Sequence, residues 1–542
     1  MRKFFLFFII ASFALLAFPQ NADDIDWRIR KEETEDSQIM HTMHYLTDVY
    51  GPRLTGSPNL KAAEDWAVKQ MTAWGFQNVH LEPWNFDHPG WMNERFSAYL
   101  IAPAHARLVG EVEAWTPGTN GPLTADVVVI DPPQRPTQEK LAAYLNTVAD
   151  AVKGKIVMIG KPRQIPINFN ETPKRREEAE LRSQFDPDNP NAGEFGRPQP
   201  QPAQGQNQEK VLSGKEIAQQ IDAFLVAHGA LGRINDAGRE HGQLIAYANQ
   251  TYDLAKAVPT VILRNDDYGR LYRLLQDQTP VKVELNIQNR SYPEGRTVYN
   301  VIAEISGSDK KDEVVMLGGH LDSWDAATGA TDNAIGSAIM MEAARILKAI
   351  GVKPRRTIRV ALWTGEEEGI WGSQAYVKQH FGSFEAPGPE FSKLDAYLNI
   401  DSGTGRARGA RVFGPPEAGT IVREDLKPFA DLDVVGAIAT KSRRIGGTDS
   451  TSFNNAGLPG IGFMQDPIEY GSYTHHTNLD TYERILPEDA KASAIAIAAV
   501  LYDLATRDDM VPRFTREQMP APVPSPYPLP GSSPTTGTSG SQ

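Results

Sequence analysis

Histidine and carboxylate side chains gather in five short segments of the C-terminal half of the chain. The residues concerned are His320 and Asp322 in Gly-Gly-His-Leu-Asp, Asp332 in Ala-Thr-Asp-Asn, Glu366 and Glu367 in Gly-Glu-Glu-Glu-Gly, Asp401 in Asp-Ser-Gly, and the pair His475 and His476. Three carboxylates held within a few ångströms of one another would repel and take up protons unless a cation neutralised them. One divalent ion would leave Asp332, Glu367 and Asp401 at a joint charge of about −1, and two would bring it to about +1, which favours binding of hydroxide.

The donor types indicate the metal. The chain has no cysteine, so any metal is held by imidazole and carboxylate groups. Such a set suits catalytic zinc with an open coordination position. Two ions roughly 3.5–4 Å apart can clamp an attacking hydroxide and polarise a carbonyl group. Asp332, which has two oxygens, could bridge two such ions.

The elements that must position these residues are predicted by an alternation of strand and helix patterns over residues 297–507. The expected strands are Thr297–Ile305, Glu313–Leu317, Arg356–Trp363, Asp395–Ile400 and Gly460–Met464, and the expected helices are Asn333–Ile350 and Pro487–Leu504. This alternation predicts an α/β sandwich, in which ligands bind beyond the carboxyl ends of the strands. Every candidate residue follows a strand or precedes a helix, so we expect all of them to converge at one end of one sheet.

The rest of the chain divides by composition. We expect a signal peptide at 1–20, the N-terminal part of the catalytic domain at 21–109, a separate inserted domain at 110–285, the catalytic domain proper at 286–510, and a disordered Pro/Ser/Gly tail at 511–542. A helix is expected over Asn59–Trp74, where apolar residues recur at helical spacing. A low-complexity stretch near 185–208, rich in Pro, Gln, Asn and Gly, is expected to be a mobile surface insertion.

Composition limits the compartment and the partners. Arg2 and Lys3 precede an apolar run that is short for a membrane span and is followed by polar sequence, which favours a cleaved signal peptide over an uncleaved anchor. We therefore expect a secreted or periplasmic protein that is not held in a membrane after cleavage. The formal net charge of −13 and the lack of a long basic run argue against nucleic acid as a partner. A homodimer is an open possibility.

Taken together and in order, the segments GGHLDSW, GATDNAIG, LWTGEEEG, NIDSG and HHTNLDT resemble those of the co-catalytic zinc exopeptidases. This family includes bacterial leucyl aminopeptidases, glutamate carboxypeptidase and carboxypeptidase Q. The resemblance is strong over 297–507 and looser over 35–110, and it implies a three-layer sandwich with a mixed central sheet and two Zn²⁺ ions per chain. The middle unit resembles a β-rich protease-associated domain.

The resemblance also implies a role for each site residue. His320 and Asp401 would bind one zinc, Glu367 and His476 the other, and Asp332 both, with Glu366 as general base, Asp322 orienting His320 and Asp480 orienting His476. His476 is preferred to His475 because the family motif places Thr or Ser directly after the ligand, as Thr477 does here. His475 would then face the substrate.

The implied activity is hydrolysis of a peptide bond near a chain terminus by a metal-bridged hydroxide. An aminopeptidase or dipeptidase is favoured over a glutamate carboxypeptidase or carboxypeptidase Q-like activity. Arginines near the expected site loops could serve a carboxypeptidase by binding the terminal carboxylate: Arg406, Arg408, Arg443 and Arg444. Three further readings stay open, namely an inactive receptor-like relative, a glutaminyl cyclase-like transferase with one zinc, and an amide deacylase acting on a non-peptide substrate.

Overall fold

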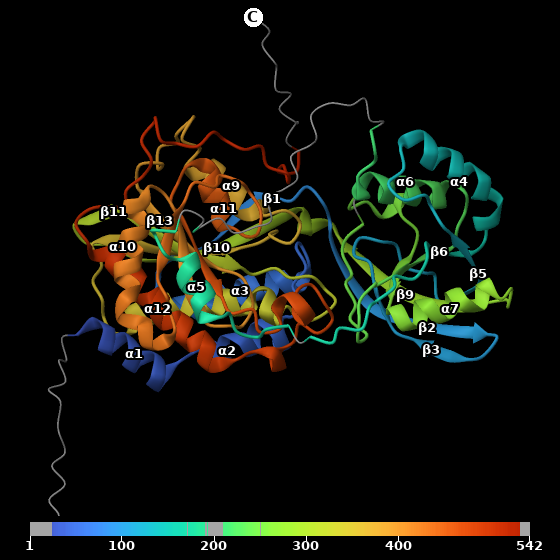
Figure 1. Ribbon diagram of the computed structural model, residues 1–542, viewed down its shortest axis with the longest axis horizontal. Helices are drawn as coiled ribbons and strands as arrows, with labels where there is room; N and C mark the ends of the chain where they lie inside the picture. The colour runs from blue at the N-terminus through green and yellow to red at the C-terminus, as the bar shows by residue number, and fades with distance from the viewer. Residues whose placement is uncertain (1–23, 171, 190–191, 193–209, 250, 532–542) are drawn as a thin grey trace, which may run out of the picture.

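The structure of the protein is a computed structural model, which describes residues 24–170, 172–189, 192, 210–249 and 251–531. The expected signal peptide lies outside these ranges. Among the helices within them, none combines the length and the apolar character that crossing a bilayer requires. The chain builds two eight-stranded mixed sheets with helices, which lie side by side in Figure 1.

The first sheet carries the strands predicted from the C-terminal half of the chain. Its order is β1 (Gln77–Asn85), β10 (Thr297–Ile305), β12 (Arg356–Trp363), β11 (Lys310–His320), β13 (Leu394–Ile400), β16 (Gly460–Gln465), β14 (Ala407–Phe413) and β15 (Ala437–Thr440). The four strands β12, β11, β13 and β16 run parallel, whereas β10 and β14 pair antiparallel with their inner neighbours. The predicted mixed α/β sheet is thus confirmed, and its parallel centre brings the carboxyl ends of four strands to one edge.

Helices cover both faces of this sheet, because the side chains of β11 are apolar on both of its faces. Val315 and Leu317 pack in the core that contains α8 (Ile335–Ala349) and α12 (Pro487–Thr506). Val314 and Met316 pack in a second core, with side chains of α9 (Trp371–His380) and α11 (Ser450–Ala456). Burial of each such side chain contributes about 1.5–3 kcal/mol. Further helices on the α8 side are α1 (Ile25–Asp36), α2 (Ile39–His44), α3 (Pro58–Ala73) and α10 (Pro416–Leu426).

Two differences from the predicted elements concern the site directly. Strand β11 runs three residues beyond the expected Leu317, so that His320 is its last residue. Gly318 permits this, because a Cβ there would lie 1.8 Å from the carbonyl oxygen of Ala361 on β12. The helix expected from Asn333 begins at Ile335, since Asp332 (φ −136°, ψ 89°) and Asn333 (φ −132°, ψ 40°) are not helical.

The second sheet lies on the right of Figure 1 and comes from the middle of the chain. Its order is β3 (Ala106–Leu108), β2 (Gly90–Ala102), β9 (Lys282–Tyr292), β5 (Leu123–Ile130), β6 (Ile156–Ile159), β7 (Gly232–Asp236), β8 (Thr260–Leu263) and β4 (Gly110–Val112). Its helices are α4 (Gln138–Val152), α6 (Gly214–Ala227) and α7 (Asn265–Gln276). The sheet spans 90–292 and not the expected 110–285, because β2 and β9 form one long antiparallel pair. Its identification as a protease-associated domain stays a prediction.

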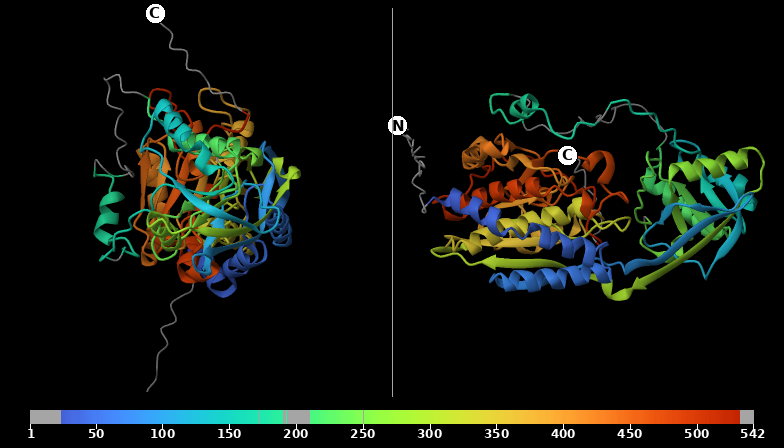
Figure 2. Two further views of the ribbon diagram at one scale, coloured as in Figure 1. Left: turned by 90° about the vertical axis from the view of Figure 1, so that its right-hand side faces the viewer. Right: turned by 90° about the horizontal axis from the view of Figure 1, so that it is seen from below.

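One segment of the expected insert does not stay with the second sheet. Helix α5 (Glu178–Gln184) lies against the first sheet, as both Figure 1 and Figure 2 show. Leu181 and Phe185 pack there with Ile438 and Met464. Of the expected low-complexity insertion, only residues 185–189 and 192 are among those described, and Phe185 is buried.

Part of the stretch from residue 511, which was expected to be a disordered tail, packs against the first sheet. Val511 and Phe514 are buried, and the backbone N–H of Val511 donates to the Asp395 carboxylate at 2.7 Å. The Phe514 ring packs edge-on against Phe413, with centroids 5.2 Å apart. Val511 and Phe514 therefore anchor this Pro-rich stretch to the first sheet, and residues after 531 lie outside the description.

Candidate metal centre

The predicted site residues meet beyond the carboxyl ends of the parallel strands. His320 ends β11, Glu366 and Glu367 follow β12, Asp401 follows β13, and Asp332 precedes α8. His476 comes from the loop before α12. Two side chains lock the start of α8 onto these strand ends: the Asn333 amide donates to the Ile400 carbonyl at 3.1 Å, and the Ser337 hydroxyl donates to the His320 carbonyl at 2.8 Å.

Asp332 lies at the centre of the cluster. Its Oδ1 lies 3.3 Å from Nε2 of His320, and its Oδ2 lies 3.2 Å from Nε2 of His476. The two oxygens of one carboxylate therefore face two different imidazoles. This is the arrangement that a carboxylate bridging two cations requires.

Each imidazole faces a second carboxylate as well. Asp401 Oδ1 lies 3.5 Å from Nε2 of His320, and Glu367 Oε2 lies 3.0 Å from Nε2 of His476. We call His320, Asp332 and Asp401 the first half-site, and Asp332, Glu367 and His476 the second half-site. Both have the imidazole and carboxylate donors that zinc accepts.

Burial and unmet polar atoms show that the cluster fits a cation. His320 and Asp332 are buried, and three atoms of the cluster have no hydrogen-bond partner among the described residues: His320 Nε2, Asp332 Oδ2 and Asp401 Oδ1. Burial and the neighbouring Asp332 raise the pKa of Glu367 to about 7. Since buried polar atoms are normally paired and buried carboxylates neutralised, this donor set is incomplete without a positive charge.

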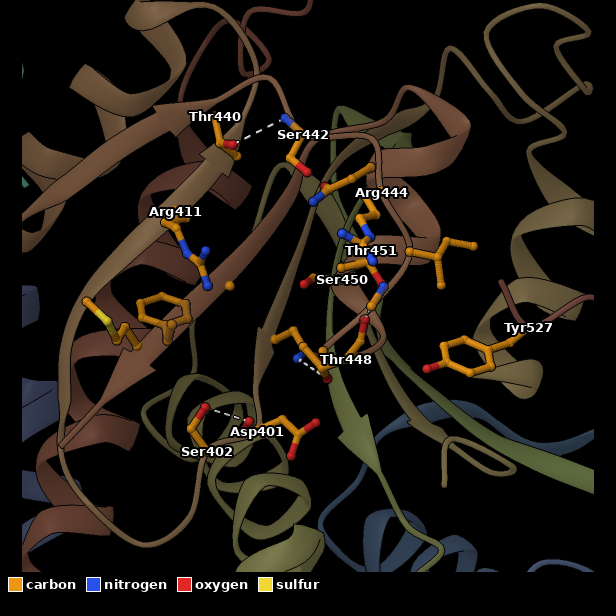
Figure 3. Close-up of a pocket in the computed structure, with 18 of the residues that line it drawn as sticks. Asp401, Ser402, Arg411, Thr440, Ser442, Arg444, Thr448, Ser450, Thr451 and Tyr527 are labelled. Carbon is orange, nitrogen blue, oxygen red and sulfur yellow. Dashed lines mark hydrogen bonds between the residues drawn. The ribbon is translucent and has the colours of Figure 1, made fainter. Parts of the chain in front are cut away.

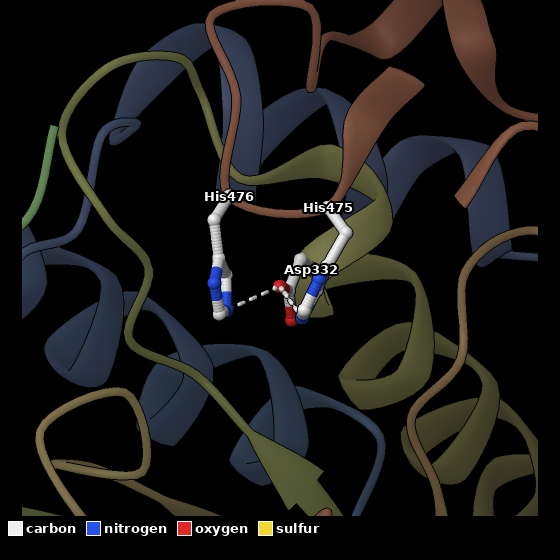
Figure 4. A group of neighbouring side chains, drawn as sticks. All are labelled: Asp332, His475 and His476. Carbon is white, nitrogen blue, oxygen red and sulfur yellow. Dashed lines mark ion pairs between the residues drawn. The ribbon is translucent and has the colours of Figure 1, made fainter. Parts of the chain in front are cut away.

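The neighbouring histidines differ in their contacts, although both rings face Asp332 (Figure 4). His475 Nε2 lies 3.7 Å from Asp332 Oδ2, whereas His476 Nε2 is closer to Asp332 and also contacts Glu367. The side chain of His475 is 45% exposed and that of His476 is 20% exposed. The geometry favours His476 as the second half-site donor and leaves His475 on the open side.

Glu366 occupies a different position from its neighbour Glu367. Its Oε2 lies 3.9 Å from Nε2 of His320, and its side chain is 12% exposed. Burial raises the pKa of Glu366 well above its ordinary value, and the negative charges of Asp401 and Asp449 add to the rise while His320 opposes it. Glu366 thus lies beside the first half-site, whereas Glu367 belongs to the second.

Asp322 contacts a residue of each half-site. Nδ1 of His320 lies 3.1 Å from the backbone carbonyl oxygen of Asp322 and 3.7 Å from its carboxylate, so the carbonyl is the nearer acceptor for the ring. The carboxylate accepts hydrogen bonds from the Glu367 backbone N–H and the Thr55 hydroxyl, each at 3.2 Å. Asp322 therefore fixes the start of the Glu366–Glu367 turn relative to His320.

Asp480 does not have the place expected for it. Its carboxylate accepts from the backbone N–H groups of Thr331 at 2.5 Å and Asp332 at 3.1 Å. It thereby supports the turn that carries Asp332 and not the ring of His476. Burial, together with the charge of Asp332, raises the pKa of Asp480 to about 7.

The group that faces the outer nitrogen of His476 is Tyr247, from the part of the chain that builds the second sheet. The Tyr247 hydroxyl lies 3.1 Å from His476 Nδ1, and its ring packs edge-on against Trp324. Next to it, the backbones of Leu244 and Asn478 are joined by an N–H to carbonyl bond of 3.1 Å. No sequence signal marks Tyr247, because it lies 229 residues from His476 in an irregular segment.

We expect Tyr247→Phe to lower the affinity of the second half-site for zinc by about 10–100-fold, because outer partners of ligating imidazoles fix the ring and its tautomer. Titration of zinc against a competing chelator measures this. Tyr99→Phe, on β2 and away from the cluster, is the matched control. Equal zinc affinities for Tyr247→Phe and wild type would remove the role given to the hydroxyl.

Arg53 is a second residue that the sequence does not reveal. It is fully buried, and its guanidinium donates to four carbonyl groups, those of Leu46, Leu321, Thr328 and Gly329. It ties both ends of the 321–329 loop to the N-terminal part of the chain. The loop between His320 and Asp332 is thus held by a residue encoded some 270 positions earlier.

Comparisons with known proteins find peptidases. Residues 300–501 match the sequence model of peptidase family M28. Carboxypeptidase Q of Mus musculus is 26% identical over 473 residues, which cover 86% of each chain. Leupeptin-inactivating enzyme 1 of Streptomyces exfoliatus is 34% identical over 184 residues, or 32% of this chain and 37% of that protein.

Solved structures share the architecture. A peptidase M28 precursor from Shewanella amazonensis SB2B has a TM-score of 0.63 and 26% identity, over 91% of this chain and 98% of that chain. BSAP, a zinc aminopeptidase from Bacillus subtilis, shares the fold at a TM-score of 0.55 and 18% identity, over 87% and 95% of the two chains. The family match covers the segment that bears the site, and with the long relatives it confirms the predicted resemblance to the co-catalytic zinc exopeptidases.

Proposed function

We propose that this protein is an exopeptidase with two zinc ions, which hydrolyses a peptide bond next to a chain terminus as an aminopeptidase or dipeptidase. The observation that carries the proposal is the position of Asp332, whose two oxygens face His320 and His476 separately. Asp401 completes the first half-site and Glu367 the second. Five donors in two groups with one shared carboxylate support two ions better than one.

The chemistry divides between the ions and Glu366. When bound, the zinc ions supply a lowered pKa for water and a positive charge beside the scissile carbonyl oxygen. Glu366 accepts the proton of the attacking water and returns it to the leaving amine. Its carboxylate lies close to the cluster without occupying the position of Glu367, which supports a role in proton transfer and not in binding metal.

The complete donor set argues against two of the open alternatives, the receptor-like relative and the cyclase. An inactive receptor-like relative would be under no constraint to keep five donors and an acid beside them. A cyclase with one zinc would need only one half-site. The second candidate is a carboxypeptidase Q-like activity, which the length of the match to carboxypeptidase Q favours.

We also propose that the chain is exported to a secreted or periplasmic location. The support is the charged and then apolar sequence of residues 1–20, together with the absence of cysteine, which leaves no thiol to be oxidised outside the cell.

The test uses purified protein stripped by chelation and reloaded with graded zinc. We expect hydrolysis to vanish on chelation and to return as zinc approaches two ions per chain. A free dipeptide, its N-acetyl form and its C-terminal amide define the specificity. Hydrolysis that an N-acetyl group blocks supports an aminopeptidase or dipeptidase, whereas cleavage of the N-acetyl form alone supports a carboxypeptidase. A zinc-loaded protein inactive on all three would overturn the proposal.

A further inference from the structure

A cavity of about 640 Å³ adjoins the metal centre at Asp401. Its walls come from β13, β14 and β16, from the segment that leaves β15 at Thr440 and enters α11, and from Pro526 and Tyr527 of the C-terminal segment. Figure 3 shows Asp401 at the bottom of this space, with Arg411 and Arg444 on opposite sides of it. A substrate whose scissile bond lies at the metal centre can therefore place a neighbouring group in the cavity.

The lining is strongly cationic. Arg176, Arg411 and Arg444 line the cavity, and Asp401 is its one acidic lining residue among those described. Asp401 is committed to the first half-site, where it faces His320. Burial, followed by the charge of Arg176, lowers the pKa of Arg411.

The other arginines near the site are already neutralised. Arg406 pairs with Asp489 and Asp433, and Arg408 pairs with Asp466 and Glu178. Arg443 pairs with Glu385. The sequence offered these three arginines as candidates for binding a terminal carboxylate. Their ion pairs argue against that role.

Arg444 differs from those three. It is exposed, and it has no ion pair among the residues that the structure describes. Arg176 is held in place by its Nε, which donates to the Gln465 carbonyl at 3.0 Å. Hydroxyl groups complete the polar lining, from Thr440, Ser442, Thr448, Ser450 and Thr451. Guanidinium forks beside hydroxyl donors match the planar acceptor geometry of a carboxylate.

We propose that this cavity, the arginine pocket, binds a carboxylate group of the peptide substrate, with Arg444 as its accessible donor and Arg176 and Arg411 as its fixed walls. The inference rests on the proposed exopeptidase function and names its substrate class. The carboxylate comes either from the C-terminus of a dipeptide or from an acidic side chain next to the scissile bond.

Three substrates separate these sources in zinc-loaded protein: Ala-Ala, which has a terminal carboxylate; Ala-Glu-amide, which has only an acidic side chain; and Ala-Ala-amide, which has neither. We expect at least one of the first two to exceed Ala-Ala-amide in kcat/KM by about tenfold or more, the scale of a charge-assisted contact. The one preferred identifies the source.

Arg444→Gln should remove most of that preference, by about 10–100-fold through KM, and leave hydrolysis of Ala-Ala-amide unchanged. Lys441→Gln is the matched control, because Lys441 is an exposed cation of the same loop that does not line the cavity. Equal rates on all three substrates, or a uniform loss in Arg444→Gln, would overturn the pocket while leaving the exopeptidase intact.

Binding of glutarate to the zinc-loaded protein by calorimetry tests the pocket without turnover. We expect wild type and Lys441→Gln to bind glutarate more tightly than Arg444→Gln does, and none of the three to bind glutaramide comparably. If no peptide is hydrolysed but this difference is found, the pocket stands and the exopeptidase proposal fails. If glutarate binds wild type and Arg444→Gln equally, the pocket is wrong whatever the activity.

Discussion

Glu366→Gln is expected to lower kcat by about 10²–10⁴-fold, the range that a positioned general base contributes, while the protein keeps the zinc content of wild type. Glutamine preserves the shape of the side chain but cannot accept and return a proton. The Glu366 carboxylate lies 3.9 Å from His320, and the second half-site is completed by Glu367. Steady-state kinetics and metal analysis of the same sample measure both parts of the result.

The run of three glutamates provides a control of equal size. Glu368 is buried, and burial followed by the charge of Asp322 raises its pKa well above the ordinary value. Glu368→Gln keeps the shape of a side chain that belongs to neither half-site, and we expect kcat to stay close to wild type. Full activity in Glu366→Gln, or loss of zinc from it, would contradict the assignment of the base.

The position of the site was predictable because its signals are local. Each ligand follows a strand or precedes a helix whose own pattern is clear, as for Asp401 after the fully buried strand β13. The carboxyl ends of parallel strands must lie along one edge, so residues that follow them converge without any knowledge of long-range contacts. Even so, His320 proved to be the last residue of its strand and not the first of a loop, because the glycines before it carry no pattern of their own.

The parts that could not be predicted depend on contacts between distant segments. Arg53 and Tyr247 hold the site from 268 and 229 residues away, and neither lies in a motif. Asp480 was expected to orient His476 because both lie in one loop, but the chain turns so that the carboxylate meets the backbone of Asp332. In the same way, a few apolar side chains decide where α5 and the segment after Val511 pack, although their composition is that of an exposed linker.

Asp332→Ala is the change with the largest expected effect on metal content. Because one carboxylate faces both imidazoles, its removal takes an oxygen from each half-site and leaves His320 with Asp401, and His476 with Glu367. We expect zinc to fall from about two ions per chain to near zero after gel filtration, with loss of activity, since zinc sites in proteins take three or four protein ligands. Asp332→Asn should keep the fold and one oxygen, and lose most of the zinc.

Comparison of Asp401→Ala with Asp332→Ala distinguishes a ligand that bridges two ions from a ligand of one ion. Asp401 faces His320 alone, so its loss should empty the first half-site and leave about one zinc with Asp332, Glu367 and His476. A zinc content near zero for Asp332→Ala beside one for Asp401→Ala requires that Asp332 serve two ions. If the two variants lose the same single ion, Asp332 belongs to one half-site only, and the two ions share no bridging carboxylate. The difference between the two metal counts, more than either count alone, therefore decides whether this centre is co-catalytic.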